Sequence, residues 1–201
     1  MSSSGVYDAA VPTEPRPYHH GDLRRALIDA ALEAIARDGP ATLSLRDLAR
    51  RVGVSHAAPA HHFGDKTGLL TAIAAEGYRR MASDLTAVFE RTGSFLEVGV
   101  AYVGFAVDHP AHFAVMFRPD LLRATDPELQ AATAASRASL YGPAESLPLP
   151  PGADRRRAAV AGWSLVHGLA TLYLDGNLPA ELGADPRAIA RDLAGYLFTR
   201  R

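Results

Sequence analysis

The polar residues between Ser44 and Lys66 have the types and spacing needed to bind nucleic acid. Four cations stand there against two acidic residues, and three histidines accompany them: Arg46, Arg50, Arg51 and Lys66, with His56, His61 and His62. A local excess of arginine and lysine neutralises phosphates, and a short helix presents side chains to base edges in the major groove. Because the formal net charge of the whole chain is −1, DNA binding must be confined to such a local patch.

The sequence offers no second site with catalytic or metal-binding chemistry. The histidine pairs at residues 19–20 and 61–62 are adjacent in sequence, so on a helix they point about 100° apart and do not form the i, i+4 clamp of zinc sites. Cysteine, the G-x-S-x-G elbow, glycine-rich phosphate loops and H-E-x-x-H are absent from the sequence, and only His112 and His167 remain as acid or base candidates. We expect no enzyme activity, no catalytic residue, no metal and no cofactor.

The composition is that of a globular protein. Hydrophobic residue types make up 48% of the 201 residues and charged types 21%, which excludes a wholly disordered chain. Residues 1–18 lack the apolar core of a signal peptide, and no run of ~20 apolar residues is free of charges or breakers. We therefore expect a cytoplasmic protein with no membrane contact, and a disordered arm over residues 1–17.

Apolar periodicity predicts a first helix over residues 23–35, where apolar side chains recur on one face. Asp22 is placed to cap this helix, and the Gly-Pro pair at 39–40 supplies its stop. Ser44 and Asp47 then form an S-x-x-D box, which predicts the start of a second helix.

A turn between two short helices follows that box. The second helix is expected to end at Val52 and Gly53, and a third to span about 56–62. A helix-turn-helix needs a small residue in its first helix and a glycine of positive φ in its turn, and Ala49 and Gly53 have that spacing. The inward-facing side chains of this unit are predicted to be Leu45, Leu48, Val52, Val54, Pro59 and Phe63.

The rest of the chain also has helical patterns, separated by breaks rich in Pro, Gly and Asp. The predicted helices cover residues 66–91, 94–107, 110–117, 128–141, 154–175 and 186–200. Strand-like alternation is absent from the sequence. We therefore predict an all-α fold, with a three-helix helix-turn-helix DNA-binding head at 18–66 and a larger helical ligand-binding and dimerisation domain at 67–201.

Residues 18–70, with the motifs LRDLARRVGVS and HHFGDKTGLL, closely resemble the TetR family of bacterial repressors. The resemblance implies that residues 55–62 form a recognition helix, with Arg46, His56, Ala57 and Ala58 facing base edges. The full set of DNA-binding residues that it implies is Ser44, Leu45, Arg46, Ser55, His56, Ala57, Ala58, Ala60, His61, His62 and Lys66.

Two positions depart from the family pattern. Pro59 stands where the family commonly has a buried leucine, which a first helical turn tolerates because the proline loses little there. Ala60 stands where the family commonly has a tyrosine that binds phosphate, so this chain lacks that contact.

The body resembles the TetR subgroup with a Trp-His-Gly signature, here Trp163, His167 and Gly168 within GWSLVHGLATLYLDGNL, together with DHPAHFAVMF. This resemblance implies a small-molecule pocket and a dimer formed by the last two helices. The expected pocket residues are Met81, Phe89, Phe105, His112, Met116, Trp163 and His167. The expected dimer residues are Val160, Ser164, Gly168, Leu172, Ile189, Leu193 and Leu197. An alternative stays open, in which Trp163 and His167 are packed core with the imidazole bonded to a backbone carbonyl.

The sequence thus predicts a TetR-like transcriptional regulator, acting as a repressor that a small, largely apolar effector releases from a palindromic operator. Its expected partners are double-stranded DNA, the effector and a second copy of the chain, with half-sites ~34–36 Å apart or a multiple of that distance. The alternative is a helical small-molecule-binding or adaptor protein with weak or lost DNA binding.

Overall fold

The described part of the chain is all-α. The computed structural model describes residues 20–147 and 149–198, so the arm expected at 1–17 lies outside the described residues. Short 3-10 helices occupy Pro40–Thr42, Pro119–Leu121, Gly142–Ser146 and Ala180–Leu182. The α-helices are α1 (His20–Asp38), α2 (Leu45–Val52), α3 (Ala58–Phe63), α4 (Lys66–Thr92), α5 (Phe95–Asp108), α6 (Pro110–Met116), α7 (Pro127–Tyr141), α8 (Arg155–Leu174) and α9 (Pro186–Phe198).

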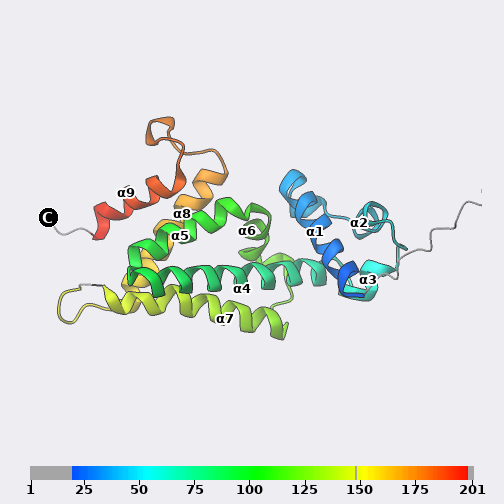
Figure 1. The fold of residues 1–201 in the computed structure, drawn as a ribbon, viewed down its shortest axis with the longest axis horizontal. Helices are drawn as coiled ribbons and strands as arrows, with labels where there is room; N and C mark the ends of the chain where they lie inside the picture. The colour runs from blue at the N-terminus through cyan, green and yellow to red at the C-terminus, as the bar shows by residue number, and fades with distance from the viewer. Residues whose placement is uncertain (1–19, 148, 199–201) are drawn as a thin grey trace, which may run out of the picture.

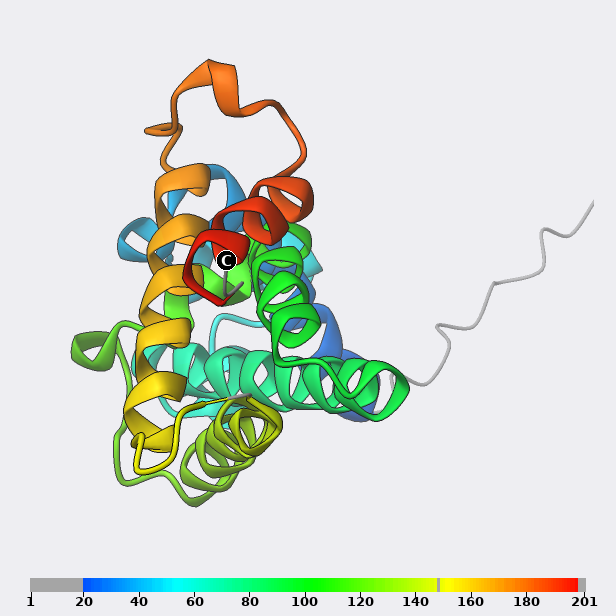
Figure 2. The ribbon, with the colours of Figure 1, turned by 90° about the vertical axis from the view of Figure 1, so that its left-hand side faces the viewer.

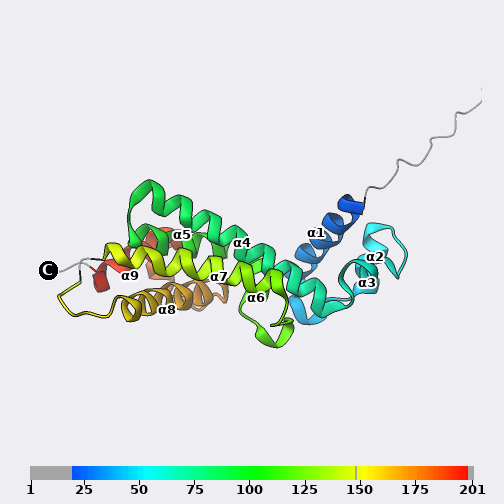
Figure 3. The same ribbon diagram turned by 90° about the horizontal axis from the view of Figure 1, so that it is seen from below.

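The molecule is elongated, with a head of α1–α3 at one end and a body of α4–α9 at the other (Figures 1 and 3). Helix α4 has 27 residues, so it is about 40 Å long at ~1.5 Å per residue, and it runs from the head into the body beside α7. Figure 2 looks along the molecule from the end that carries α9. Of the described helices, none is long and apolar enough to span a membrane.

The start of α1 differs from the prediction. The helix begins at His20, two residues before Asp22, so Asp22 lies in the first turn and the predicted cap at this position is wrong. The end is as expected, because Gly39 takes a φ of 79° directly after the helix.

Only one of the two contacts of the predicted S-x-x-D capping box forms at the start of α2. The Ser44 hydroxyl accepts a hydrogen bond from the Asp47 backbone N–H at 3.4 Å. The Asp47 carboxylate lies 3.0 Å from the Arg50 guanidinium instead of reaching back to the cap. Gly53 has φ 75° and ψ 34°, the left-handed conformation that the turn requires.

One hydrophobic cluster joins the head to the body. Leu27 and Leu48 of the head and Leu69 and Ile73 of α4 are all buried within it, together with Tyr102 of α5. Burial of apolar surface is the main source of stability, so head and body share part of their core instead of meeting through a flexible linker.

Close packing of α4 against α6 depends on Gly77. A Cβ at this position would come within 2.6 Å of the Met116 sulfur and 3.1 Å of the His112 Cβ. At that contact the Tyr78 hydroxyl donates a 2.5 Å hydrogen bond to the Met116 carbonyl. The short helix α6 is therefore fixed directly on the middle of α4.

Two ion pairs hold α9 on α5. Arg191 lies 2.8 Å from Glu97, and Arg187 pairs with Asp108. The inner face of α9 is apolar, and Ile189 is buried there with only 4% of its surface exposed. The prediction that Ile189 faces a partner copy is therefore wrong: its position on α9 turns it into the core of its own chain.

Candidate nucleic-acid interface and ligand cavity

Helix α3 begins at Ala58, two residues later than predicted, and His56 and Ala57 form the turn before it. The His61 N–H bonds to the Ala57 carbonyl at 3.0 Å, so this turn leads directly into the helix. Pro59 is buried within the first turn of α3. There its missing N–H and fixed φ fit the helix without loss.

The residues proposed to face DNA line the outer surface of the head. Exposed members of the set are Arg46, Ser55, His56, Ala57, Ala60 and His61, and partly buried members are Ser44, Leu45, Ala58, His62 and Lys66. The polar groups of Ser44 and Lys66 already have partners within the head. The Ser44 hydroxyl caps α2, and the Lys66 ammonium donates to the Ala41 carbonyl at 2.6 Å.

The junction between α3 and α4 is fixed from the body. Asp65 caps α4 by accepting a hydrogen bond from the Gly68 N–H at 2.8 Å, and Arg123 lies 2.8 Å from the same carboxylate. Arg123 belongs to the segment between α6 and α7, and its backbone N–H bonds to the Thr71 hydroxyl at 3.0 Å. No local sequence pattern predicts this link, because the two ends of the ion pair are 58 residues apart.

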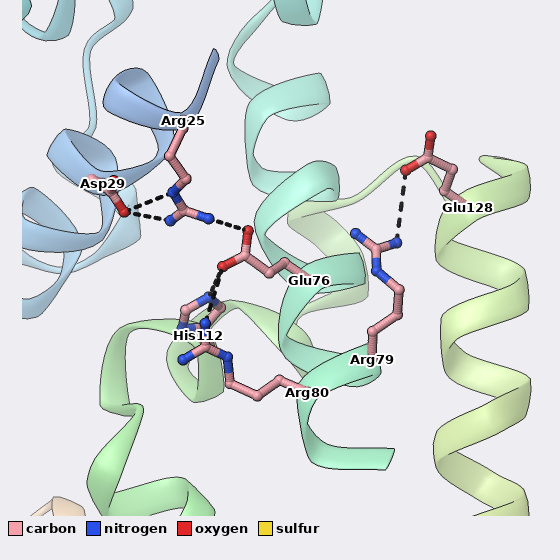
Figure 4. A network of polar contacts seen from close by, with 7 residues as sticks. All are labelled: Arg25, Asp29, Glu76, Arg79, Arg80, His112 and Glu128. Atoms are coloured by element: carbon pink, nitrogen blue, oxygen red, sulfur yellow. Dashed lines mark hydrogen bonds and ion pairs between the residues drawn. The ribbon is translucent and has the colours of Figure 1, made fainter. Parts of the chain in front are cut away.

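A second polar link joins α1 to α4 and α6 (Figure 4). The Glu76 carboxylate accepts hydrogen bonds from Arg25 at 2.7 Å and from the His112 ring at 3.2 Å. Arg80 is 3.8 Å from Glu76, and Asp29 binds Arg25 from the outer side. The head is thus tied to the middle of α4 by a carboxylate that is only 19% exposed.

Burial and charge set the protonation of this link. Desolvation by burial acts to raise the pKa of Glu76, but the Arg25 and His112 interactions outweigh it and hold the pKa below its usual value. Desolvation lowers the pKa of His112, more than the Glu76 carboxylate raises it. The ring therefore favours its neutral form and donates its one N–H to Glu76.

A cavity of about 700 Å³ lies among α4, α7, α8 and the segment after α6. This volume is in the ~300–1,000 Å³ range of small-molecule sites. The lining residues are Tyr78, Met81, Met116, Phe117, Pro119, Leu122, Ala124, Leu129, Gln130, Thr133, Ala134, Ser136, Arg137, Leu140, Tyr141, Arg156 and Trp163.

Three of the predicted pocket residues line this cavity: Met81, Met116 and Trp163. The other four do not. His167 lines a separate space of about 470 Å³ between α1, α6 and α8. Phe105 and His112 are buried in the packing around α6, and Phe89 packs on the core. The aromatic and histidine residues among the predicted pocket residues face inward. Their residue types do not show which of them line a cavity and which of them pack in the core.

His167 and Trp163 belong to a partly buried chain of hydrogen bonds. The Trp163 N–H donates to the Tyr102 hydroxyl at 3.3 Å, and that hydroxyl donates to the Nδ1 of His167 at 2.8 Å. Desolvation lowers the pKa of His167, which favours the neutral ring that can accept this proton. The imidazole is thus held by a phenol, and not by a backbone carbonyl as the alternative interpretation had it.

The structure adds two arginines that the sequence analysis missed, Arg137 on α7 and Arg156 on α8. A signal was present in α7, whose QAATAASRAS run is rich in small side chains. Five residues of this run line the cavity: Gln130, Thr133, Ala134, Ser136 and Arg137.

The apolar residues of α8 lie on two opposite faces of the helix, one buried and one exposed. Ala159, Val166 and Ala170 are buried, whereas Val160 and Leu172 are 42% and 45% exposed. A Cβ at Gly168 would meet no atom within 4 Å, so the outward face is uncovered there. Leu193 is partly buried against the core, and the side chain of Leu197 lies outside the described residues.

The head and body together define a class of protein: a helix-turn-helix unit joined to a helical body with an internal cavity. A family model described as "Bacterial regulatory proteins, tetR family" matches residues 27–73, and one described as "Tetracyclin repressor-like, C-terminal domain" matches residues 95–195. The chain belongs to the TetR family of bacterial regulatory proteins. The narrower Trp-His-Gly subgroup stays a prediction.

Individual relatives agree with this assignment. The solved structure of a protein with unknown function from Rhodococcus sp. RHA1 matches with TM-score 0.76 and 34% identity, over 92% of this chain and 97% of that one. A TetR-family regulatory protein from Rhodococcus RHA1 matches with TM-score 0.66 and 25% identity, over 87% and 96%. The HTH-type transcriptional regulator BetI of Agrobacterium fabrum is 34% identical over 87 residues, and the match spans 42% of each chain.

Proposed function

We propose that the chain is a non-enzymatic, dimeric transcriptional repressor, with a DNA-binding head at residues 18–66 and a ligand-binding and dimerisation body at 67–201. The observation that carries the proposal is the course of α4. Its cap, Asp65, lies two residues after the end of α3, and Tyr78 and Met81, further along the same helix, line the 700 Å³ cavity. One rigid element therefore connects a base-reading surface to a space of effector size.

The head supplies both kinds of contact that sequence-specific binding needs. Exposed Arg46 and His56 are proposed to reach base edges, while Ser55 and His61 hold the phosphate backbone. Arg46 is exposed and has no ion pair among the described residues, so its guanidinium is available to a guanine edge. The match of residues 27–73 to the tetR family of bacterial regulatory proteins does not favour the alternative of an adaptor without DNA binding.

Two sets of polar contacts connect the cavity wall to the head: the Arg123–Asp65 pair, and the contacts of Glu76 with Arg25 and His112. Pro119, Leu122 and Ala124 line the cavity on the same segment that carries Arg123, which holds Asp65. Met116 lines the cavity on α6, the helix that carries the Glu76 partner His112. A ligand that displaces either element moves an anchor of the head, and this biases the spacing of the two heads in a dimer.

The dimer is proposed to form through the uncovered face of α8 and the adjoining outer face of α9. Val160 and Leu172 are exposed apolar side chains on one stripe of α8, with Gly168 between them. An isologous contact places this stripe against its own copy, and the small residues permit close approach.

Selection of bound duplexes from a randomised DNA pool tests the proposal. The full chain is expected to enrich an inverted repeat with half-sites ~34–36 Å apart or a multiple of that distance. Arg46→Ala is expected to relax base preference at one position in each half-site, whereas Arg157→Ala, an equal loss of charge on α8, leaves the selected sequence unchanged. A pool with no enriched sequence would refute the proposal.

A further inference from the structure

We propose that the α4–α7–α8 cavity binds an amphipathic anion, that is, a molecule with an apolar body and a carboxylate or phosphate head group. The inference rests on the proposed function, because it names the chemical class of the effector for the same cavity. It is carried by the distribution of charge along the cavity wall.

The inner part of the cavity is apolar. Met81 and Met116 are 0% and 2% exposed, and Leu129 is also buried. Phe117 and Trp163 add aromatic surface to the same wall. These side chains accept an alkyl or aromatic body, and thioethers adapt readily to its shape.

The open part of the cavity is basic. Arg137 and Arg156 both line it, both are exposed, and the described residues give neither of them an ion pair. Their neighbours Arg155 and Arg157 on α8 are instead paired, with Glu145 at 3.6 Å and with Asp154 at 3.3 Å.

Nothing in the cavity wall balances these two charges. Aspartate and glutamate are absent from the described lining. Burial raises the pKa of Tyr78 to about 12, while the positive charge of Arg137 acts to lower it. The Arg137 guanidinium therefore interacts electrostatically with a residue of the cavity wall. Two unpaired guanidiniums at the mouth of an apolar space attract an anion and repel a cation.

The position of the charges orients the ligand. Lining residues on α7 run from Leu129 to Tyr141, which is about 18 Å along the helix at ~1.5 Å per residue. Arg137 lies near the end of α7, and Arg156 lies at the start of α8, away from the head (Figures 1 and 3). A head group held there directs the apolar body toward Pro119 and Leu122, beside the Arg123 anchor.

Binding of four matched probes with the same alkyl chain tests the inference: decanoate, decyl phosphate, decanol and decyltrimethylammonium. Trp163 is the only tryptophan of the chain and lines the cavity, so its fluorescence reports binding directly. At least one of the two anions is expected to bind at least about tenfold more tightly than decanol, or ~1.4 kcal/mol, and the ammonium is expected to bind more weakly than decanol. The relative affinity of decanoate and decyl phosphate decides between the two head groups.

Charge-removing variants locate the effect. Arg137→Gln with Arg156→Gln is expected to abolish the preference for anions, while Arg157→Gln, the matched control on α8, retains it. Equal binding of the anions and the alcohol, stronger binding of the cation, or no binding of any probe would overturn the inference.

A separate readout distinguishes this failure from failure of the proposed function. Release of DNA by decanol with no preference for anions would overturn the ligand class alone. Anion binding by a protein that selects no DNA would support the ligand class and overturn the repressor.

Discussion

The guanidinium of Arg25 on α1 lies 2.7 Å from the carboxylate of Glu76 on α4. The same carboxylate receives the His112 ring from α6, so one partly buried side chain connects the head to two helices of the body (Figure 4). Removing its charge therefore affects both stability and the position of the head.

Glu76→Gln is expected to destabilise the protein by about 1–3 kcal/mol. The substitution removes the negative charge, so the hydrogen bonds from Arg25 and His112 lose their ionic partner and become weaker. The free energy of unfolding from urea titration measures the loss. Glu128→Gln is the matched control, because the Glu128–Arg79 ion pair is 3.7 Å apart and both side chains are exposed. This variant is expected to lower the free energy of unfolding by less than about 0.5 kcal/mol. Equal effects of the two variants would contradict this role of Glu76.

Ala60→Tyr is expected to strengthen DNA binding. Ala60 is exposed on α3, so a tyrosine there meets solvent in the free protein and can reach a phosphate in the complex. A neutral hydrogen bond contributes ~0.5–1.5 kcal/mol net. A dimer makes it twice, which gives roughly fivefold to a hundredfold in affinity at ~1.4 kcal/mol per decade.

Filter binding of the Ala60→Tyr protein to the selected duplex at several salt concentrations measures this gain. A phenol adds no charge and displaces no extra counterion, so the slope of log affinity against log salt should stay nearly constant. An affinity no higher than that of the parent would mean that α3 docks differently from the family pattern.

The sequence predicted the head well because its signals are local. The Ser44 cap, the Gly53 turn and the periodic apolar face of α1 each depend on residues within a few positions of one another. The cavity could not be predicted in the same way. Its lining comes from α4, α7, α8 and the segment after α6, and no one of these elements alone specifies the space between them.

The long-range ion pairs escaped sequence analysis for a related reason. Arg25 and Glu76 are 51 residues apart, and no periodicity links them. The wrong prediction for Ile189 has a different cause. An apolar residue on a terminal helix fits a partner interface and an internal core equally well, and only the packing of α9 on α5 shows that Ile189 is buried in its own chain.

Acidification is expected to destabilise the folded protein partly through His167. Its pKa in the folded state is lowered from the usual 6.5 by desolvation, so the unfolded state binds more protons just below that pH. The contribution of neutral His167 to the stability of the folded state is therefore complete above pH 6.5, and it is lost as the pH falls through the pKa of His167 in the folded state. The melting temperature of the parent should fall between about pH 7.5 and about pH 5.5.

His167→Gln tests this assignment, since glutamine keeps a polar group beside Tyr102 and does not titrate. The fall in melting temperature over the same interval should be smaller for this variant than for the parent. His61→Gln, on the exposed face of the head, is the control and should keep the parent's dependence. An unchanged slope in His167→Gln would show that other groups account for the acid sensitivity.

Leu172→Arg is expected to convert a dimer into a monomer at working concentration. Leu172 is 45% exposed on the proposed α8 interface, and because the contact is symmetric, its replacement places one guanidinium from each copy in an apolar interface. Leu182→Arg changes an equally exposed leucine outside α8, 43% accessible, and should remain dimeric. Light scattering over a concentration series measures both, and a parent that is monomeric throughout would exclude the proposed interface.

Coupling between the cavity and the head is measured by the affinity for the selected duplex with and without saturating decanoate. We predict that decanoate weakens DNA binding at least about tenfold, and that DNA weakens decanoate binding by the same factor. Arg123→Gln, which removes the Asp65 anchor, should reduce this factor while leaving decanoate affinity without DNA unchanged. DNA affinity that stays the same when the cavity is occupied would show that the cavity and the head are not coupled.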